Sequence, residues 1–88
     1  MRIVLTGIAD LADGERLFVC GDRSELGSWD PERARPLHKD DEGWSTSIPP
    51  GDGTFKFLRR SADGTIIWEG GENREIGTAI EIETDWHV

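Results

Sequence analysis

The residues best suited to chemistry in this sequence are its tryptophans, four in a chain that has no tyrosine. Trp29 lies in a stretch bounded by glycine and proline, and Trp68 lies at the end of an expected strand, just before two glycines. A flat, rigid indole gains contact area against the apolar C–H face of a sugar ring, while nearby polar groups bond the ring hydroxyls. The sequence therefore predicts a sugar-stacking surface at Trp29 and Trp68, with Lys56, Glu69 and Asn73 as polar partners.

Each of these residues also has a purely structural interpretation. Tryptophans of small domains are mostly buried, and position alone does not decide between core and surface for Trp29 and Trp68. Lys56 falls between two phenylalanines in an expected strand, so it points to the face opposite them, where the alternative is an ordinary solvated lysine. Asn73 suits a tight turn after the glycines. We expect a structural role for Arg74, in a pair with a nearby carboxylate.

The remaining tryptophans and the reactive residue types favour structure over catalysis. Trp44 begins an alternating strand and Trp86 follows the last one, so both are expected in the core or at its edge. Cys20 is expected to be a small buried residue. The 18 acidic residues form no recognisable catalytic motif, and a domain this small has no deep, dry cleft to raise the pKa of a carboxylic acid. The two histidines and the cysteine lack metal-ligand spacing. We therefore expect no enzymatic activity, no cofactor and no metal.

Length and charge restrict the partners and the compartment. The 88 residues suffice for a single domain over 1–88. The net charge of −8, with no stripe of Lys or Arg, argues against nucleic acid and anionic membranes as partners. No stretch reaches the roughly 18 apolar residues of a membrane span, and the N-terminal stretch has no signal-peptide pattern. These features predict a cytoplasmic location if the chain is a whole protein, and an extracellular one if it is a fragment of a secreted enzyme.

The alternation of apolar and polar residues predicts an all-β chain. The expected strands cover residues 1–8, 16–20, 35–38, 44–48, 55–60, 65–69 and 77–84. Asp-Gly pairs at 13–14 and 63–64 predict hairpins between the strands on either side of them. Residues 21–36 are expected to form a structured loop that carries a tryptophan, and residues 39–43 a charged turn. Seven or eight short strands in this length favour a β-sandwich.

Four separated blocks also resemble a known family. In chain order they are Leu26-Gly27-Ser28-Trp29-Asp30-Pro31, Gly43-Trp44, Phe55-Lys56-Phe57-Leu58 and Trp68-Glu69-Gly70-Gly71-Glu72-Asn73-Arg74. Together these blocks resemble the family 20 carbohydrate-binding modules, the starch-binding domains, over nearly the whole chain from about Ile3 to Ile82. The resemblance implies an antiparallel β-sandwich of immunoglobulin-like character, in agreement with the strand pattern.

The resemblance also implies roles for individual residues. In the family, the tryptophans of the first and last blocks form the two walls of a binding site, and these match Trp29 and Trp68. The family lysine and asparagine that hydrogen-bond sugar hydroxyls match Lys56 and Asn73, and Glu69 is a further expected contact.

The function that the resemblance implies is non-catalytic binding of α-glucans such as starch, glycogen and maltodextrin, as polysaccharide or oligosaccharide. The module would bring an attached or associated amylolytic or glycogen-metabolising enzyme to the glucan. The family's second site uses tyrosines in two loops, and the corresponding residues 11–14 and 39–43 include none. The alternative function is that of a protein-interaction or regulatory β-sandwich whose exposed tryptophans contact another protein.

Overall fold

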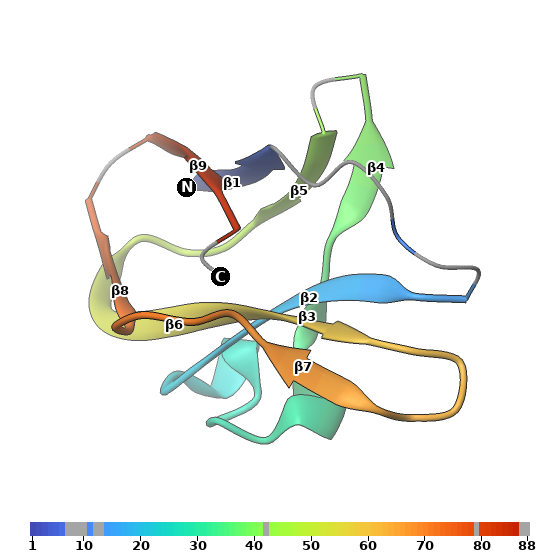
Figure 1. Cartoon of the computed structure of the whole chain (residues 1–88). Helices are drawn as coiled ribbons and strands as arrows, with labels where there is room; N and C mark the ends of the chain where they lie inside the picture. The colour runs from blue at the N-terminus through green and yellow to red at the C-terminus, as the bar shows by residue number, and fades with distance from the viewer. Residues whose placement is uncertain (7–10, 12–13, 42, 79, 87–88) are drawn as a thin grey trace.

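The chain folds into two facing β-sheets in a computed structural model that describes residues 1–6, 11, 14–41, 43–78 and 80–86 (Figure 1). The elements of the described residues are β1 (Arg2–Thr6), β2 (Arg16–Gly21), the 3-10 helices η1 (Ser24–Leu26) and η2 (Pro31–Arg33), β3 (Arg35–Pro36), β4 (His38–Asp40), β5 (Gly43–Ser47), β6 (Gly51–Arg60), β7 (Ile66–Trp68), β8 (Arg74–Gly77) and β9 (Glu81–Asp85). The all-β sandwich is thus confirmed, with nine short strands among the described residues rather than seven or eight. No helix in this described part is long and apolar enough to cross a membrane.

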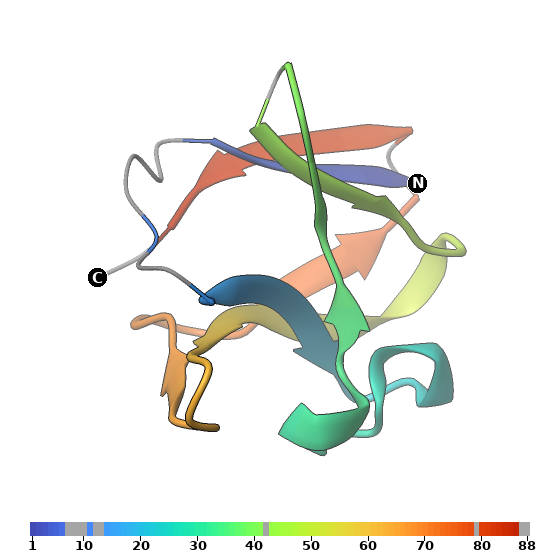
Figure 2. The same cartoon turned by 90° about the vertical axis from the view of Figure 1, so that its right-hand side faces the viewer.

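The strands form two layers, which Figure 2 shows one above the other. One sheet has the order β4-β5-β1-β9. The other has the order β3-β2-β6-β7, and β8 also pairs with β6. The pairing is antiparallel throughout these sheets except between β1 and β9, which run parallel from Arg2 opposite Glu81 to Thr6 opposite Asp85. The expected antiparallel, immunoglobulin-like sandwich therefore contains one parallel pair.

Of the two expected hairpins, one is confirmed and one is wrong. Around Gly64, β6 and β7 pair antiparallel with Arg60 opposite Ile66, and the Gly64 N–H donates to the Ser61 carbonyl at 3.0 Å. The strands on either side of residues 13–14 instead lie in different sheets, because β1 pairs with β5 and β9 whereas β2 pairs with β3 and β6. Residues 7–10 and 12–13 of this connection lie outside the described residues.

Several element boundaries also differ from expectation. The strand β8 was not expected, β6 begins at Gly51 instead of residue 55, and β9 begins at Glu81 instead of residue 77. The expected charged turn after residue 39 is shortened because β4 runs on to Asp40. Residues 21–36 do form a structured segment, with two 3-10 helices and the two residues of β3 at its end. These differences all concern polar or glycine-rich stretches, in which the alternation of apolar residues is weakest.

The main core lies between the two layers. Its buried side chains are Ile3, Leu5, Leu17, Val19, Leu26, Leu37, Ile48, Phe55, Phe57 and Ile76. Each large side chain buried in this way contributes roughly 1.5–3 kcal/mol by removal from water. Trp44 and Trp86 are partly buried and pack against this cluster, which agrees with their expected place in the core or at its edge.

A second apolar cluster lies on the outer face of the five-stranded sheet. Phe18, Cys20 and Leu58 are buried there, and Trp29 packs against them together with Ala34 and Ile66. The cause is the two-residue period of a strand: β2 carries apolar side chains on both faces, so its outer face also needs a cover. The segment between β2 and β3, with η1 and η2, supplies that cover below the sheet (Figure 1).

Candidate functional site

The segment that carries Trp29 is shaped by local hydrogen bonds and a left-handed backbone. Gly27 caps the C-terminal end of the helix η1 with a φ of 86°. This φ is left-handed, and glycine adopts such a conformation without steric cost. Ser28 and Trp29 follow with φ of 51° and 63°, which side-chain-bearing residues rarely adopt. The Trp29 N–H donates to the Gly21 carbonyl at 2.7 Å, and Asp30 then caps η2. This unusual backbone directs the Trp29 indole back onto the sheet.

Trp68 contributes to the same surface from the strand β7. It is the last residue of β7 and stands opposite Leu58 of β6, so both side chains lie on the outer face of the sheet. The Trp68 and Trp29 ring centroids are 6.2 Å apart, with the ring planes tilted by 50°. Trp68 is 37% exposed and Trp29 is partly buried by the second apolar cluster. Two residues distant in the sequence therefore form one solvent-accessible aromatic surface.

Lys56 and Asn73 complete a groove of about 310 Å³ beside this surface, which we call the stacking groove; its lining residues are Trp29, Lys56, Trp68 and Asn73. Lys56 stands opposite Cys20 on the outer face, while its neighbours Phe55 and Phe57 are buried in the core. Its predicted direction is therefore correct. The structure brings together four of the five site residues that the sequence singles out.

The Lys56 ammonium also holds the loop beyond Trp68. Its Nζ donates to the Gly71 carbonyl at 2.6 Å and to the Glu69 carbonyl at 3.3 Å. An ammonium has three donors, so these two bonds leave one N–H for a further acceptor. Lys56 is thus part of both the groove lining and the support of the neighbouring loop.

Glu69 requires a correction, because its side chain does not reach the groove. The residue is only 2% exposed. Its Oε1 accepts from the Phe57 N–H at 3.0 Å and from Arg74 Nε at 2.9 Å, and its Oε2 accepts from Arg74 Nη2 at 3.0 Å. A carboxylate with such partners and no exposure is not available to a sugar, so the expected contact is replaced by a structural role. The structural role expected for Arg74, beside a carboxylate, is what the structure shows.

A second depression, of about 490 Å³, includes Gly14 and Lys39, from the two stretches that the sequence analysis compared with the family's second site. Its lining residues are Gly14, Glu15, Arg16, Pro36, Leu37, His38, Lys39 and Trp44. Trp44 is the aromatic residue of this lining, so the sequence analysis missed that this core-edge residue also reaches a surface depression. The sequence signal for this surface position is the residue type, because an amphipathic indole can be partly buried and still expose one edge.

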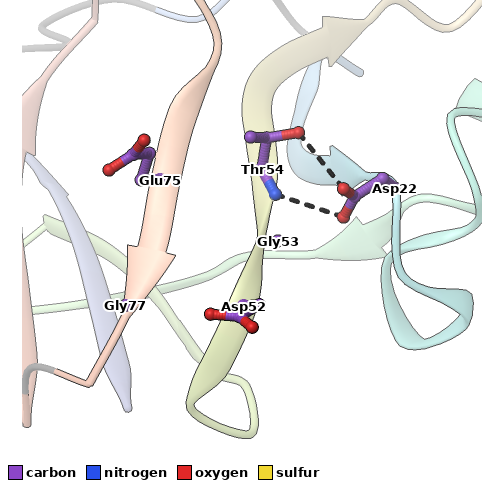
Figure 3. Close-up of a pocket in the computed structure, with 6 residues that line it drawn as sticks. All are labelled: Asp22, Asp52, Gly53, Thr54, Glu75 and Gly77. Atoms are coloured by element: carbon purple, nitrogen blue, oxygen red, sulfur yellow. Dashed lines mark hydrogen bonds between the residues drawn. The ribbon is translucent and has the colours of Figure 1, made fainter.

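A third depression, of about 320 Å³, is acidic (Figure 3); its lining residues are Asp22, Asp52, Gly53, Thr54, Glu75 and Gly77. The Asp22 carboxylate accepts from the Thr54 N–H at 3.1 Å and from the Thr54 hydroxyl at 3.4 Å, so it is engaged in holding β6 (Figure 3). Among the described residues, no group of His, Cys, Asp or Glu is arranged to hold a metal ion.

Comparison with known proteins gives consistent matches. The family model described as "Starch binding domain" matches residues 1–86. A cyclomaltodextrin glucanotransferase of Bacillus sp. (strain 38-2) is 37% identical over 86 residues, which covers 89% of this chain and 12% of that protein. The AA13 family lytic polysaccharide monooxygenase A of Aspergillus terreus is 39% identical over 69 residues, which covers 69% of this chain and 17% of that protein. The chain therefore spans less than a fifth of the length of either relative.

The fold has a match among solved structures as well. The crystal structure of the family 20 carbohydrate-binding module of a maltotetraose-forming amylase from Pseudomonas saccharophila has a TM-score of 0.71 and 21% identity to this chain. The match covers 98% of this chain and 100% of that one, so the two share one fold over their whole described length.

Proposed function

This chain belongs to the starch-binding domain family, and we propose that its stacking groove binds α-glucans such as starch, glycogen and maltodextrin without acting on them chemically. The family match over residues 1–86 supports a binding module rather than a catalyst. The observation that carries the assignment to this groove is the convergence of Trp29 and Trp68 at a centroid distance of 6.2 Å.

The ring geometry favours two stacked sugars over one. A sugar held between two parallel indoles would need the rings about 7–8 Å apart, because each carbon–carbon contact has its optimum at about 3.5–4.0 Å. The observed 6.2 Å is too short for this, and the 50° tilt gives two facets instead of a slot. Successive glucoses of an α-1,4-linked chain turn relative to each other, so a bent pair of facets suits them. We infer that each indole stacks on its own glucose ring.

Lys56 and Asn73 supply the polar contacts in this proposal. Both line the groove beside the indoles, where the hydroxyls at the edge of a stacked ring come within reach. The remaining N–H of the Lys56 ammonium donates to one hydroxyl, and the Asn73 amide both donates and accepts. Shallow stacking with a few such bonds corresponds to micromolar to millimolar dissociation constants, or roughly −4 to −8 kcal/mol. A polymer binds more strongly because it offers many overlapping sites.

Titration with β-cyclodextrin tests this proposal, with calorimetry and tryptophan fluorescence as readouts. We expect binding by the unaltered chain, and loss of at least about tenfold in affinity for Trp29→Ala and for Trp68→Ala, since each removes one stacked ring. Ile67→Ala is the matched control: Ile67 is 46% exposed on the same strand as Trp68, but it faces the other way. A folded chain that binds no glucan would refute the proposal and leave the protein-interaction alternative.

We also propose that the module works next to an amylolytic activity. The support is that this chain matches only 12% of a cyclomaltodextrin glucanotransferase, so that relative carries the corresponding domain within a much longer chain. An attached or associated glycogen-metabolising enzyme is the other possibility of this class. The location then follows that of the enzyme, extracellular for a secreted one and cytoplasmic otherwise. The nucleotide sequence on either side of the segment that encodes this chain tests which enzyme domain, if any, is attached and whether a secretion signal accompanies it.

A further inference from the structure

The loop between β7 and β8 forms one border of the stacking groove. An ion pair between its first residue and the first residue of β8 closes it. Residue 69 begins the loop directly after Trp68, and Asn73 ends it directly before Arg74. Glu69 and Arg74 join in a bidentate ion pair at 2.9 and 3.0 Å, with side-chain exposures of 0% and 14%. Because the pair joins the first residue of the loop to the residue that follows it, the loop is held as a closed ring of main chain and side chains.

Glu69 ties this ring to β6 by extending the β6–β7 pairing beyond the end of β7. Its N–H donates to the Phe57 carbonyl at 3.0 Å, as a strand residue would. Its side-chain Oε1 then accepts from the Phe57 N–H at 3.0 Å, in place of a main-chain carbonyl. The carboxylate therefore accepts the hydrogen bond of the buried Phe57 N–H, which lies beyond the end of the β6–β7 pairing. This bond holds the start of the loop against β6.

Arg74 ties the same ring to the opposite sheet. Its Nη1 donates to the Thr84 hydroxyl and its Nη2 to the Asp85 carbonyl, both at 2.7 Å, and both acceptors belong to β9. The guanidinium also lies 5.0 Å from the centre of the Phe57 ring. A planar guanidinium with several donors at fixed angles can serve all these partners at once, whereas a lysine ammonium cannot.

The loop in turn orders the polar lining of the groove. Its carbonyls at positions 69 and 71 are the two acceptors that hold the Lys56 ammonium. Its last residue is Asn73, which lines the groove. A shift of the loop would therefore displace both groups that are expected to meet sugar hydroxyls, while leaving Trp29 on its separate apolar cluster.

We propose that Glu69 and Arg74 are positioning residues for glucan binding, which set Lys56 and Asn73 at the stacking groove by closing the loop between β7 and β8. This inference rests on the proposed function. A buried ion pair is weak evidence for stability, because well-packed apolar residues often stabilise a fold equally well. The geometric control of the loop gives this pair a role that apolar residues would not fulfil.

The test compares β-cyclodextrin affinity among variants at a temperature where each is fully folded. Arg74→Lys keeps the charge and loses the bidentate geometry, and Glu69→Gln keeps the size and loses the charge. We expect each to weaken binding about tenfold. In a background that carries both Lys56→Ala and Asn73→Ala, the same substitutions should weaken binding by less than about threefold, because both groups that they position are already gone.

A control variant separates positioning from stability. Ile76→Val removes one buried methylene from β8, two residues after Arg74, and should lower the unfolding midpoint while leaving the dissociation constant unchanged. The positioning role is refuted if the unaltered chain binds and folded Arg74→Lys and Glu69→Gln bind equally well. It is also refuted if these variants lose the same factor in affinity with and without the Lys56 and Asn73 side chains. If the unaltered chain does not bind at all, the proposed function itself fails.

A measurement on the unaltered chain covers the case in which the variants do not fold. Coupling between the ligand and the closed loop is reciprocal, so bound β-cyclodextrin must stabilise the closed form. The Phe57 N–H reports this state because it donates to the Glu69 carboxylate. We expect saturating ligand to slow hydrogen exchange at this amide at least as much as at Val19 in the core. An unchanged exchange rate at Phe57, with slowed exchange at Val19, would overturn the inference.

Discussion

The left-handed backbone at Trp29 reverses the usual order of alanine and glycine. A residue with a Cβ at a left-handed φ costs roughly 1–2 kcal/mol, and Trp29 has a φ of 63°. Glycine avoids this strain but loses about 0.5–1 kcal/mol more than alanine in conformational entropy on folding. Trp29→Ala and Trp29→Gly remove the same indole, so the lost packing on the second apolar cluster cancels between them. We therefore expect Trp29→Gly to be the more stable by about 0.5–1 kcal/mol.

Urea and thermal unfolding of the two variants measure this difference. For a domain of this size, about 1 kcal/mol corresponds to about 4–8 °C in the unfolding midpoint, so Trp29→Gly should unfold a few degrees above Trp29→Ala. Ser47, exposed at the end of β5 and without a positive φ, provides the matched pair in which alanine should be the more stable. If Trp29→Ala equals or exceeds Trp29→Gly while the Ser47 pair keeps its usual order, the left-handed conformation at Trp29 is wrong.

Two further predictions concern the stability of the fold. In Gly21→Ala the new Cβ would lie 2.3 Å from the Thr54 carbonyl oxygen. We therefore expect the free energy of unfolding, measured with urea, to fall by about 2–3 kcal/mol. A loss below about 0.5 kcal/mol would contradict this close approach. Hydrogen bonds from the Ser61 hydroxyl and then the Thr65 N–H lower the pKa of Asp63 to about 2, so its contribution to stability is present above about pH 4 and is lost as the pH falls towards 2. An NMR titration should show this low midpoint, and Ser61→Ala should raise it; a midpoint near 4 in the unaltered chain would refute the assignment.

The sequence predicts those parts of the fold that depend on neighbouring residues. The turn around Gly64 joins strands that continue directly into it, so its Asp-Gly signal is sufficient. The same signal at Gly14 fails, because a local turn preference does not say whether the chain stays in one sheet or crosses to the other. In the structure β2 instead lies in the five-stranded sheet, between β3 and β6. Such a contact between distant strands leaves no local pattern.

In the site, too, the sequence predicts the residues whose direction follows from their own strand or loop, but not those whose direction depends on a distant partner. The positions of Trp29, Lys56, Trp68 and Asn73 around one groove agree with the pattern of aromatic and polar residues read from the sequence. Glu69 differs because the direction of a carboxylate after a strand end depends on which cation comes to meet it. Arg74 was expected to have a carboxylate partner, but 18 acidic residues compete for that role and spacing alone does not select one. The strand β8 was not expected because Arg74–Gly77 contains a single large apolar residue, Ile76, and therefore shows no alternation.

The parallel pair β1–β9 determines where other polypeptide can join the module. Both strands belong to the four-stranded sheet, whereas Trp29 and Trp68 lie on the outer face of the five-stranded sheet. Because the two strands are parallel, Arg2 at the start of β1 pairs with Glu81, whereas Asp85 at the end of β9 pairs with Thr6, so Arg2 and Asp85 lie at opposite ends of the sheet. Polypeptide joined before Arg2 and polypeptide joined after Asp85 would therefore leave this sheet from opposite ends.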